Sequence, residues 1–256
     1  MHAHRFSASH TCIKSTIYDR LKNIFKILIE KLTLLSIFAS ASIFMGIKER
    51  KTKHKEDLKQ SILDAAKKVF LEEGYDATSI RKIAAEIEFS PTTIYLYYKD
   101  KNEIAHALHE EGFKILSERF AVLAHVEHPF ERLKAMGRIY MQFALENNDY
   151  YEIMFIMREP IAAFENGCVE EEWDEGKRAF STLVGTIQQC QEAGYFKGFE
   201  TNAFALVVWS TMHGLCTMKT HGHLELIVKK KEILTDVEDV FTHTFECFVQ
   251  LLEKLK

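Results

Sequence analysis

The stretch FSPTTIYLYYKDKNEI, over positions 89–104, gathers side chains that could form hydrogen bonds to a row of acceptors. Three tyrosines, Tyr95, Tyr97 and Tyr98, fall within four positions, and a Lys-Asp-Lys run follows them. The phosphates of nucleic acid form such a row, and over half of protein–DNA hydrogen bonds go to phosphate and sugar. The alternative is that the tyrosines pack against a helical core, so the elements that position them must decide between the two.

The residues before this stretch are predicted to form two helices. From His54 to Glu73, apolar residues recur in steps of three and four, which is typical of one amphipathic helix. Gly74 follows at the position where a left-handed residue can end a helix. Thr78 is expected to cap a second helix, because a threonine hydroxyl can accept hydrogen bonds from the free N–H groups of the next turn.

A third helix is predicted to begin with Ser90 as its N-cap and Pro91 as its first residue, and to run to about Tyr97. Two short helices joined by a tight turn are typical of the helix-turn-helix motif, whose second helix presents its first turn to the major groove of DNA. Asp100 is expected to cap a fourth, longer helix, with Glu103 at the capping-box position.

The rest of the chain is also predicted to be helical, because prolines are few and no segment shows the alternation of a strand. Further helices are expected over Pro129–Asn147, Asp149–Glu159, Trp173–Ala193, Thr201–Thr220 and Lys229–Lys254. The predicted fold class is all-α. An N-terminal three-helix domain with a helix-turn-helix would occupy residues 45–98, and a second helical domain residues 99–256.

Charge and cysteine usage restrict the class of protein. Residues 1–44 carry a net charge of +4, residues 45–104 of +1 and residues 105–256 of −9, which add to −4 for the whole chain. A basic end beside an acidic body favours a polyanionic partner at that end, although a solvated lysine-rich helix start would give the same pattern. The five cysteines are far apart, as expected for free thiols in a reducing cytoplasm.

Motifs of enzymes and cofactor sites are missing from the sequence. It contains no Gly-rich phosphate loop, no HExxH and no nucleophile elbow. His221 and His223 could bind a metal, but alternate residues of a helix point apart. We therefore expect no catalytic residues, no cofactor and no metal site.

The first 44 residues have three interpretations. They combine a basic run with an apolar stretch over 32–44, which is too short to span a bilayer comfortably. The favoured interpretation is a start assigned too far upstream, with Met45 as the true initiator. The alternatives are a functional N-terminal helix, which would make the chain a membrane-associated helical protein or pack on its body, and a signal peptide cleaved near Ala39-Ser40-Ala41.

The segment ATSIRKIAAEIEFSPTTIYLYYKDKNEI resembles the TetR/AcrR family of transcriptional regulators. The matching positions are Thr78, Ile83-Ala84, Ser90, Thr93-Ile94-Tyr95, Tyr97, Tyr98 and Lys101. The family has a glycine in the turn where this chain has Glu88. A second, shorter resemblance lies in VVWSTMHGLCTM, where Trp209, His213 and Gly214 are similar to the Trp-x3-His-Gly (WHG) element of one C-terminal ligand-binding subclass.

The resemblance implies which residues contact a double-stranded DNA operator. Tyr95, Tyr97 and Lys101 would bind phosphates, with Thr78 helping at the helix end, and Tyr98 would belong to the core. The tip of the third helix, which begins at Ser90, offers base-contacting candidates with short side chains that suit thymine methyl groups and modest hydrogen bonding. These candidates are Pro91, Thr92 and Thr93.

The resemblance also implies that a small molecule, whose identity the sequence does not give, fills the C-terminal domain and loosens DNA binding. Soft and aromatic side chains in the middle helices are candidates for its pocket, although an ordinary helical core would contain the same residue types. The candidates are Met136, Tyr140, Phe143, Met154, Phe155, Trp209 and His213. A buried Arg138 or His213 would supply a polar contact. The fourth helix would transmit the change to the DNA-binding domain.

A single helix-turn-helix reads one half-site, so a homodimer and a palindromic operator are expected. The last two long helices are the predicted interface, through two apolar stripes that could form an intersubunit four-helix bundle. The stripes are Phe204, Val208, Thr211 and Leu215, and Phe241, Phe245, Phe248 and Leu252. The alternative is that both stripes are buried within one subunit.

Overall fold

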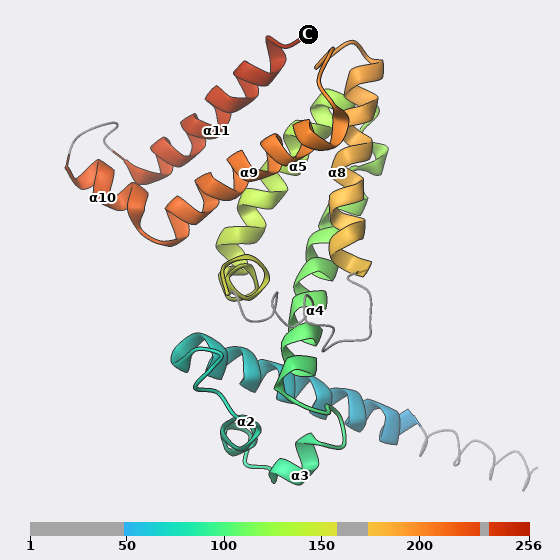
Figure 1. Ribbon diagram of the computed structural model, residues 1–256, viewed down its shortest axis with the longest axis vertical. Coiled ribbons are helices and arrows are strands. Elements are labelled where there is room, and N and C mark those ends of the chain that lie inside the picture. The colour runs from blue at the N-terminus through green and yellow to red at the C-terminus, as the bar shows by residue number, and fades with distance from the viewer. Residues whose placement is uncertain (1–48, 158–173, 231–235) are drawn as a thin grey trace, which may run out of the picture. The chain divides into compact units, whose positions relative to one another are not determined.

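The computed structural model describes residues 49–157, 174–230 and 236–256, and every regular element among these residues is a helix (Figure 1). The all-α prediction is therefore confirmed. The N-terminal extension over 1–44 lies outside the described residues. The chain divides into two units, residues 1–60 and residues 61–256. None of the helices that the structure describes is long and apolar enough to cross a membrane.

The N-terminal part of the second unit contains the end of a helix over 49–73 and two short helices, α2 (Ile80–Glu86) and α3 (Pro91–Ile94). The first helix ends at Gly74, which has a φ of 83°, as its position in the sequence predicted. The cap of α2 was predicted wrongly. Ser79, not Thr78, accepts a hydrogen bond from the backbone N–H of Lys82, at 3.4 Å.

The remaining elements follow in chain order. They are α4 (Lys101–Ala121), η1 (Val122–His125), α5 (Pro129–Glu146), α6 (Asn148–Tyr151), a π-helical turn η2 (Glu152–Ile156), α8 (Asp174–Glu192), α9 (Thr201–Thr220), α10 (His223–Lys229) and α11 (Val237–Glu253). Asp100 caps α4 as expected, because its carboxylate accepts from the N–H groups of Asn102 and Glu103 at 2.8 and 3.0 Å.

The end of the chain differs from the single helix predicted over Lys229–Lys254. The helix α10 ends at Lys229, and α11 begins only at Val237. Asp236 explains the new start, since its side chain accepts a hydrogen bond from the N–H of Glu238 at 2.7 Å. An aspartate followed by two further acids is an N-terminal signal, and the periodicity of the apolar residues concealed it.

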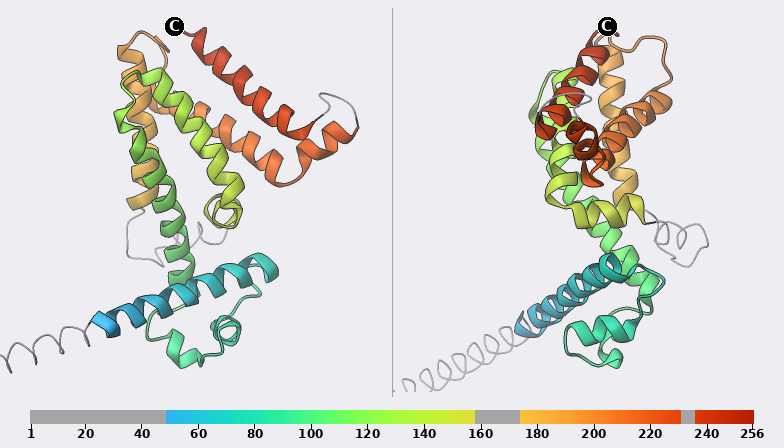
Figure 2. Two further views of the ribbon diagram at one scale, coloured as in Figure 1. Left: turned by 180° about the vertical axis from the view of Figure 1, so that it is seen from behind. Right: turned by 90° about the vertical axis from the view of Figure 1, so that its left-hand side faces the viewer.

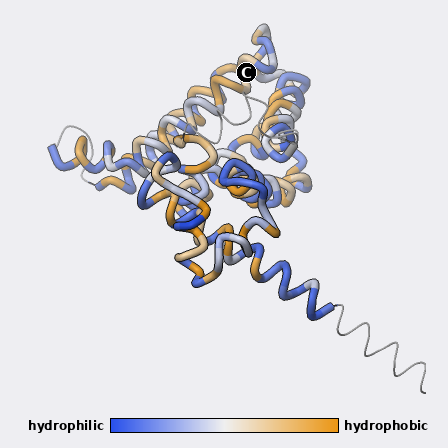
Figure 3. The backbone as a smooth tube through the Cα atoms, turned by 60° about the horizontal axis from the view of Figure 1, so that its bottom comes forward, coloured by the Kyte–Doolittle hydropathy of each residue, from blue (hydrophilic) through white to orange (hydrophobic). Residues whose placement is uncertain are grey.

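A hydrophobic core joins α5, α8, α9 and α11. In Figures 1 and 2, α8 runs beside α4 and α5, and α9 crosses α5. Phe130 of α5 stacks on Tyr195 with ring centroids 4.7 Å apart, and Phe196 and Phe204 pack at 4.5 Å. Figure 3 shows hydrophobic and hydrophilic residues interleaved along the helical parts of the chain. This amphipathic pattern is what lets several helices share one core.

Candidate functional site

The helix-turn-helix is built around buried aliphatic side chains. Ile80, Ile83 and Ala84 of α2 and Ile94 of α3 are buried. Between the helices, Phe89 N–H donates to the carbonyl of Ala84 at 2.9 Å. These contacts fix the angle at which α3 leaves the turn.

The helix α3 is shorter than predicted. Ser90 accepts from the N–H of Thr93 at 3.2 Å and Pro91 is the first helical residue, as expected. After Ile94, the N–H groups of residues 96 and 97 donate to carbonyls three residues back rather than four. The regular helix therefore gives way to turns over 95–97.

The tyrosines divide between core and surface. Tyr98 is 3% exposed, which agrees with its predicted place in the core. Tyr95 is 56% exposed and Tyr97 is partly exposed, so both rings can be reached from outside. Ser90 and Thr92 are exposed as well, and Pro91 and Thr93 are partly exposed. The DNA-contact candidates at and just after α3 are therefore all at least partly accessible.

Lys101 and Thr78 link α4 to the loop that precedes α2. The Lys101 ammonium donates to the carbonyls of Tyr75 and Thr78, at 2.9 and 3.3 Å, and lies 4.3 Å from the centroid of the Tyr75 ring. Thr78 is buried, and its hydroxyl donates to the carbonyl of Gly74 at 2.7 Å. A phosphate cannot reach that hydroxyl, so Thr78 positions its neighbours instead.

The turn carries backbone strain at Glu88. This residue has a φ of 57°, in the left-handed region that favours glycine. A side chain with a Cβ in this region costs about 1 kcal/mol or more. Glu88 thus replaces the glycine of the family at a position where glycine is favoured, because only glycine adopts this φ without steric cost.

Replacing Glu88 by glycine is expected to raise the free energy of unfolding by about 1 kcal/mol, because glycine adopts this φ without steric cost. The corresponding rise in Tm is about 2–4 °C for a chain of this size, which thermal unfolding followed by circular dichroism would resolve. The matched control is Glu88→Ala, which removes the same carboxylate but keeps the Cβ. An equal shift in both variants would assign the effect to the charge instead.

A second link connects the helix over 61–73 to α6. The Lys67 ammonium lies 2.8 Å from the Asp149 carboxylate and 4.0 Å from the centroid of the Tyr150 ring. Lys67 is mostly buried at this contact. The segment α6 leads directly into η2. The helix-turn-helix and the helix before it therefore contact the rest of the second unit at two places, through Lys101 of α4 and through α6.

A cavity of about 250 Å³ lies between α4, α5, η2, α8, α9 and α11. Its walls are almost entirely apolar. They include Phe113, Leu116 and Phe120 of α4, Met136 and Tyr140 of α5, Phe155 of η2, Ala179, Phe180 and Leu183 of α8, Trp209 of α9, and Phe245, Phe248 and Leu252 of α11. Among the described lining residues, Lys134 is the one charged residue, and its ammonium pairs with Glu131 at 2.5 Å.

One wall of the cavity adjoins a hydrogen-bonded network. Trp209 Nε1 donates to the Tyr140 hydroxyl at 3.2 Å. His213 Nδ1 lies 3.2 Å from the Tyr140 hydroxyl and 2.7 Å from the Tyr151 hydroxyl, which also contacts Thr217 Oγ1 at 3.0 Å. Burial raises the pKa of Tyr140 well above its usual value and lowers the pKa of His213. Both groups are therefore neutral near pH 7.

Two models of known protein families match the second unit of the chain, one near its N-terminal end and one over its C-terminal part. Residues 62–108 match the model of bacterial regulatory proteins of the tetR family, and residues 133–247 match that of the tetracyclin repressor-like C-terminal domain. Together the two matched ranges cover more than half of the chain. The chain belongs to the TetR family. The resemblance seen in the sequence is confirmed, and the C-terminal match includes the Trp-x3-His-Gly element.

Similar proteins include transcriptional regulators of low identity to this chain. An HTH-type transcriptional regulator of Staphylococcus aureus is 20% identical over 157 residues, which are 61% of this chain and 85% of the relative. A putative TetR-family regulator from Syntrophomonas wolfei has a TM-score of 0.59 at 22% identity, covering 77% of this chain and 95% of its own. The regulator FadR from Bacillus subtilis, solved in complex with stearoyl-CoA, has a TM-score of 0.57 at 19% identity, covering 74% and 97%.

The structure separates the pocket candidates into two groups. Met136, Tyr140, Phe155 and Trp209 line the cavity, whereas Phe143, Met154 and His213 are not among its lining residues. Phe143 is fully buried beside the Arg119 guanidinium. Met154 packs so closely on α4 that a Cβ at Gly112 would overlap its sulfur. His213 lies behind the wall that Tyr140 and Trp209 form.

Arg138 was wrongly expected to be buried. It is exposed, and its guanidinium lies 5.7 Å from the centroid of the Phe245 ring, so it does not supply a buried polar contact. The reason is its register on α5, where Met136 and Tyr140 take the inward positions and Arg138 lies between them.

The two stripes predicted for dimerisation are mostly buried within one chain. Phe204, Val208, Leu215, Phe241, Phe245 and Leu252 are each less than 9% exposed in the single chain. Phe245, Phe248 and Leu252 line the cavity. For these buried members the predicted role at a subunit interface is wrong, because the periodicity that marked them as buried reflects packing inside the subunit. Thr211 is the one exposed member of the stripes among the described residues.

The contribution of α8 to the cavity was not foreseen. Ala179, Phe180 and Leu183 line it together with residues from α4 and α5. Their spacing of one and three residues marks a single helical face, but the sequence offered no sign that this face bounds a space rather than a solid core.

Proposed function

We propose that this TetR-family chain is a dimeric DNA-binding repressor of the cytoplasm, released from a palindromic operator by a small, mainly apolar ligand. In this proposal, residues 45–98 bind DNA and residues 99–256 bind the ligand and form the dimer. The observation that carries the proposal is the double role of α4. Its first residue, Lys101, holds the DNA-binding loop, while Phe113, Leu116 and Phe120 form a wall of the cavity.

The coupling follows from that arrangement. A ligand that enters the cavity contacts α4 and Phe155 of η2, and each leads to a contact with the DNA-binding end. The ligand weakens DNA binding only if it binds the DNA-incompetent arrangement more tightly. The resulting coupling free energy is typically about 1–3 kcal/mol, or roughly a 5–150-fold change in operator affinity.

The apolar lining supports the choice of ligand class. A charged group would lose its hydration against walls that are almost entirely apolar, and Lys134, the one charged residue among the described lining residues, already pairs with Glu131. The similar chain of FadR from Bacillus subtilis was solved with stearoyl-CoA, a molecule with a long apolar chain. We infer a ligand with an extended apolar part for this chain as well.

The DNA-binding surface of the proposal is the exposed side of α3 and the turns after it. Tyr95 and Tyr97 donate to phosphates, and Pro91, Thr92 and Thr93 meet base edges. Two of the three N–H groups of Lys101 are used by backbone carbonyls. The third is available to a phosphate oxygen, so the same side chain can bind DNA and anchor the loop.

Replacing Tyr95 by phenylalanine is expected to weaken binding to operator and non-operator duplexes alike, by about 2- to 12-fold, because one hydrogen bond to phosphate is lost. Lys101→Ala is expected to weaken both and to lower the slope of log affinity against log salt by about one unit. Fluorescence anisotropy over a salt series measures both quantities. Lys114→Ala, an exposed change further along α4, is the matched control. An unchanged salt slope in Lys101→Ala would contradict its contact with phosphate.

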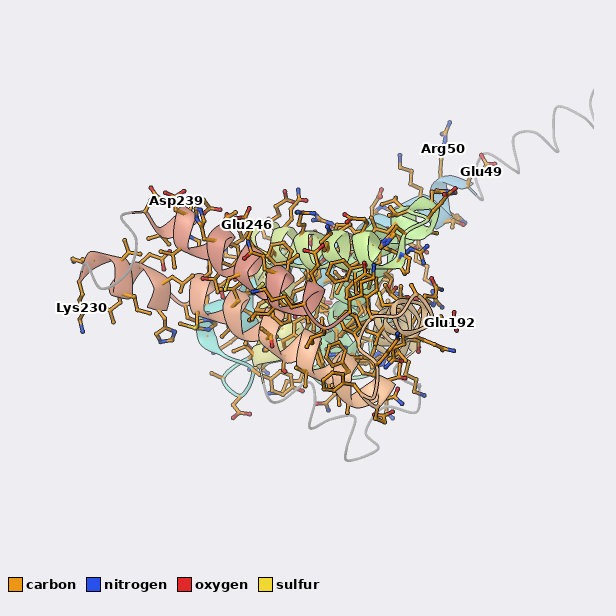
Figure 4. The ribbon with its side chains drawn as sticks, turned by 90° about the horizontal axis from the view of Figure 1, so that it is seen from above. Glu49, Arg50, Glu192, Lys230, Asp239 and Glu246 are labelled. Atoms are coloured by element: carbon orange, nitrogen blue, oxygen red, sulfur yellow. The ribbon has the colours of Figure 1, made fainter. Side chains whose placement is uncertain are left out.

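The proposed dimer uses the outward faces of α9 and α11 rather than the buried stripes. Val207, Thr211, Gly214 and Met218 lie at steps of three and four on the exposed side of α9. On α11, Leu251 is 57% exposed. Figure 4 shows the acidic side chains of Asp239 and Glu246 on the outside of α11. A second copy that packs on these outward faces would bury them in an intersubunit helix bundle.

A further inference from the structure

Two neighbouring pairs of residues join α4 to the π-helical turn η2. Phe113 of α4 and Phe155 of η2 both line the cavity, and their rings meet edge to face with centroids 5.4 Å apart. The residue directly before each phenylalanine belongs to the second pair, which is Gly112 and Met154. Both are buried, and neither is among the lining residues, so this second pair lies behind the two rings.

Met154 packs against α4 only because residue 112 has no side chain. A Cβ on Gly112 would overlap the Met154 sulfur and would lie 2.9 Å from its Cγ. The same Cβ would lie 3.3 Å from Cδ1 of Tyr150, so α6 closes on this position as well. Because protein interiors are close-packed, even one added methyl group would have to displace the methionine.

His109 adds a polar contact at the same place. Its side chain is buried on α4 one turn before Gly112, and it forms a hydrogen bond with the backbone of Met154. Burial lowers the pKa of His109 to about 4, so the imidazole is neutral near pH 7. The helix α4 therefore holds Met154 by both its side chain and its backbone.

The contact between Gly112 and Met154 lies between two links to the DNA-binding end. On α4, Lys101 holds the loop before α2 and stands eleven residues before Gly112. On α6, Asp149 pairs with Lys67 and stands five residues before Met154. Because close-packed interiors transmit strain, the packing of Met154 on Gly112 sets how these two links are placed relative to each other.

We propose that Gly112 and Met154 are the positioning residues through which the cavity controls operator binding. A ligand that presses Phe113 and Phe155 apart also separates these two residues, because each shares its backbone with one of the phenylalanines. The closed arrangement, with Met154 against Gly112, binds DNA, and the separated arrangement is the one that the ligand stabilises. The inference rests on the proposed function, since it names the contact that couples the proposed cavity to the operator.

Replacing Gly112 by alanine tests the proposal, because the added methyl group wedges α4 away from Met154 without any ligand. The full-length variant is expected to bind the operator about 5- to 150-fold more weakly than the wild type does. It is also expected to bind phenylnaphthylamine, a neutral fluorescent dye, more tightly by up to the same factor, because the separated arrangement is already populated. Fluorescence anisotropy of the operator and a dye titration measure the two affinities.

A second substitution supplies the rescue. The double variant Gly112→Ala, Met154→Ala lacks the sulfur and Cγ atoms that the new methyl group would displace. Both affinities should therefore return to within about threefold of the wild-type values, because the two changes act on one contact. Gly185→Ala is the matched control, since it makes the same change within α8 where a Cβ meets no described atom within 4 Å. It should leave both affinities unchanged.

Three results would overturn the inference. They are an unchanged operator affinity in Gly112→Ala, a loss of affinity for operator and dye together, which a damaged fold would give, and a double variant that does not recover. In each case, a wild type that binds the dye and then releases the operator would still support the proposed function. A wild type that does not bind the dye would overturn the ligand control of the proposed function and this inference together.

Discussion

Replacing Ala179 by tryptophan will make operator affinity independent of ligand. Ala179 is buried on α8 and lines the cavity, and α8 makes no part of the DNA-binding surface. The indole group would occupy most of a space of about 250 Å³. Ligand binding is expected to weaken the operator affinity of the wild type about 5- to 150-fold and to leave the operator affinity of the variant unchanged.

The measurement is an operator titration with and without phenylnaphthylamine, a neutral apolar dye, for both proteins, at fixed salt. Gln188→Trp is the control, because Gln188 is exposed on the same helix and the change adds the same side chain outside the cavity. It should respond as the wild type does. A variant Ala179→Trp that keeps the full response would show that the ligand acts elsewhere than in this cavity.

Unfolding of Ala179→Trp would not imitate the expected result. Overpacking typically costs about 1–3 kcal/mol, and an unfolded variant would lose operator binding altogether. The expected variant binds the operator with one affinity in both conditions. Ala179→Leu adds less volume, and it should reduce the response without abolishing it.

The parts of the fold that the sequence predicted well depend on local signals. Ser90-Pro91 and Asp100 determine where α3 and α4 begin through hydrogen bonds within one turn, and such bonds need no tertiary context. Thr78 and Ser79 show the limit of this reasoning. Both residues can cap a helix, but the Thr78 hydroxyl donates to the carbonyl of Gly74 in the preceding turn, which leaves Ser79 as the cap.

The cavity could not be predicted in the same way. Hydrophobic periodicity identifies which face of a helix is buried, but it does not identify the partner that covers the face. Phe245 and Leu252 were assigned to a subunit interface for this reason, although they line the cavity. Met154 and Phe155 are neighbours of similar character, and the π-helical turn places only Phe155 at the cavity.

Replacing Gly214, on the outward face of α9, by arginine is expected to have the largest effect on DNA binding. Gly214 is exposed, and a Cβ built on it meets no atom of the described residues within 4 Å. In the proposed dimer, this missing side chain allows a second helix to approach closely. An arginine would hold the two subunits apart and place two like charges near the twofold axis.

The variant is expected to be monomeric and to bind the operator about 100- to 10,000-fold more weakly, because two linked half-site contacts become independent. The subunit itself should become more stable by about 0.5–1 kcal/mol, since glycine is unfavourable within a helix. Sedimentation equilibrium measures the first effect and operator titration the second. Denaturant unfolding measures the third, against wild type diluted until it is monomeric, because association itself stabilises a dimer. A merely misfolded variant would lose stability instead, so the opposite signs distinguish the two explanations.

Gln188→Arg, which places the same charge on the exposed side of α8, should remain a dimer with full operator affinity. If Gly214→Arg also remains a dimer, the interface does not include this face of α9.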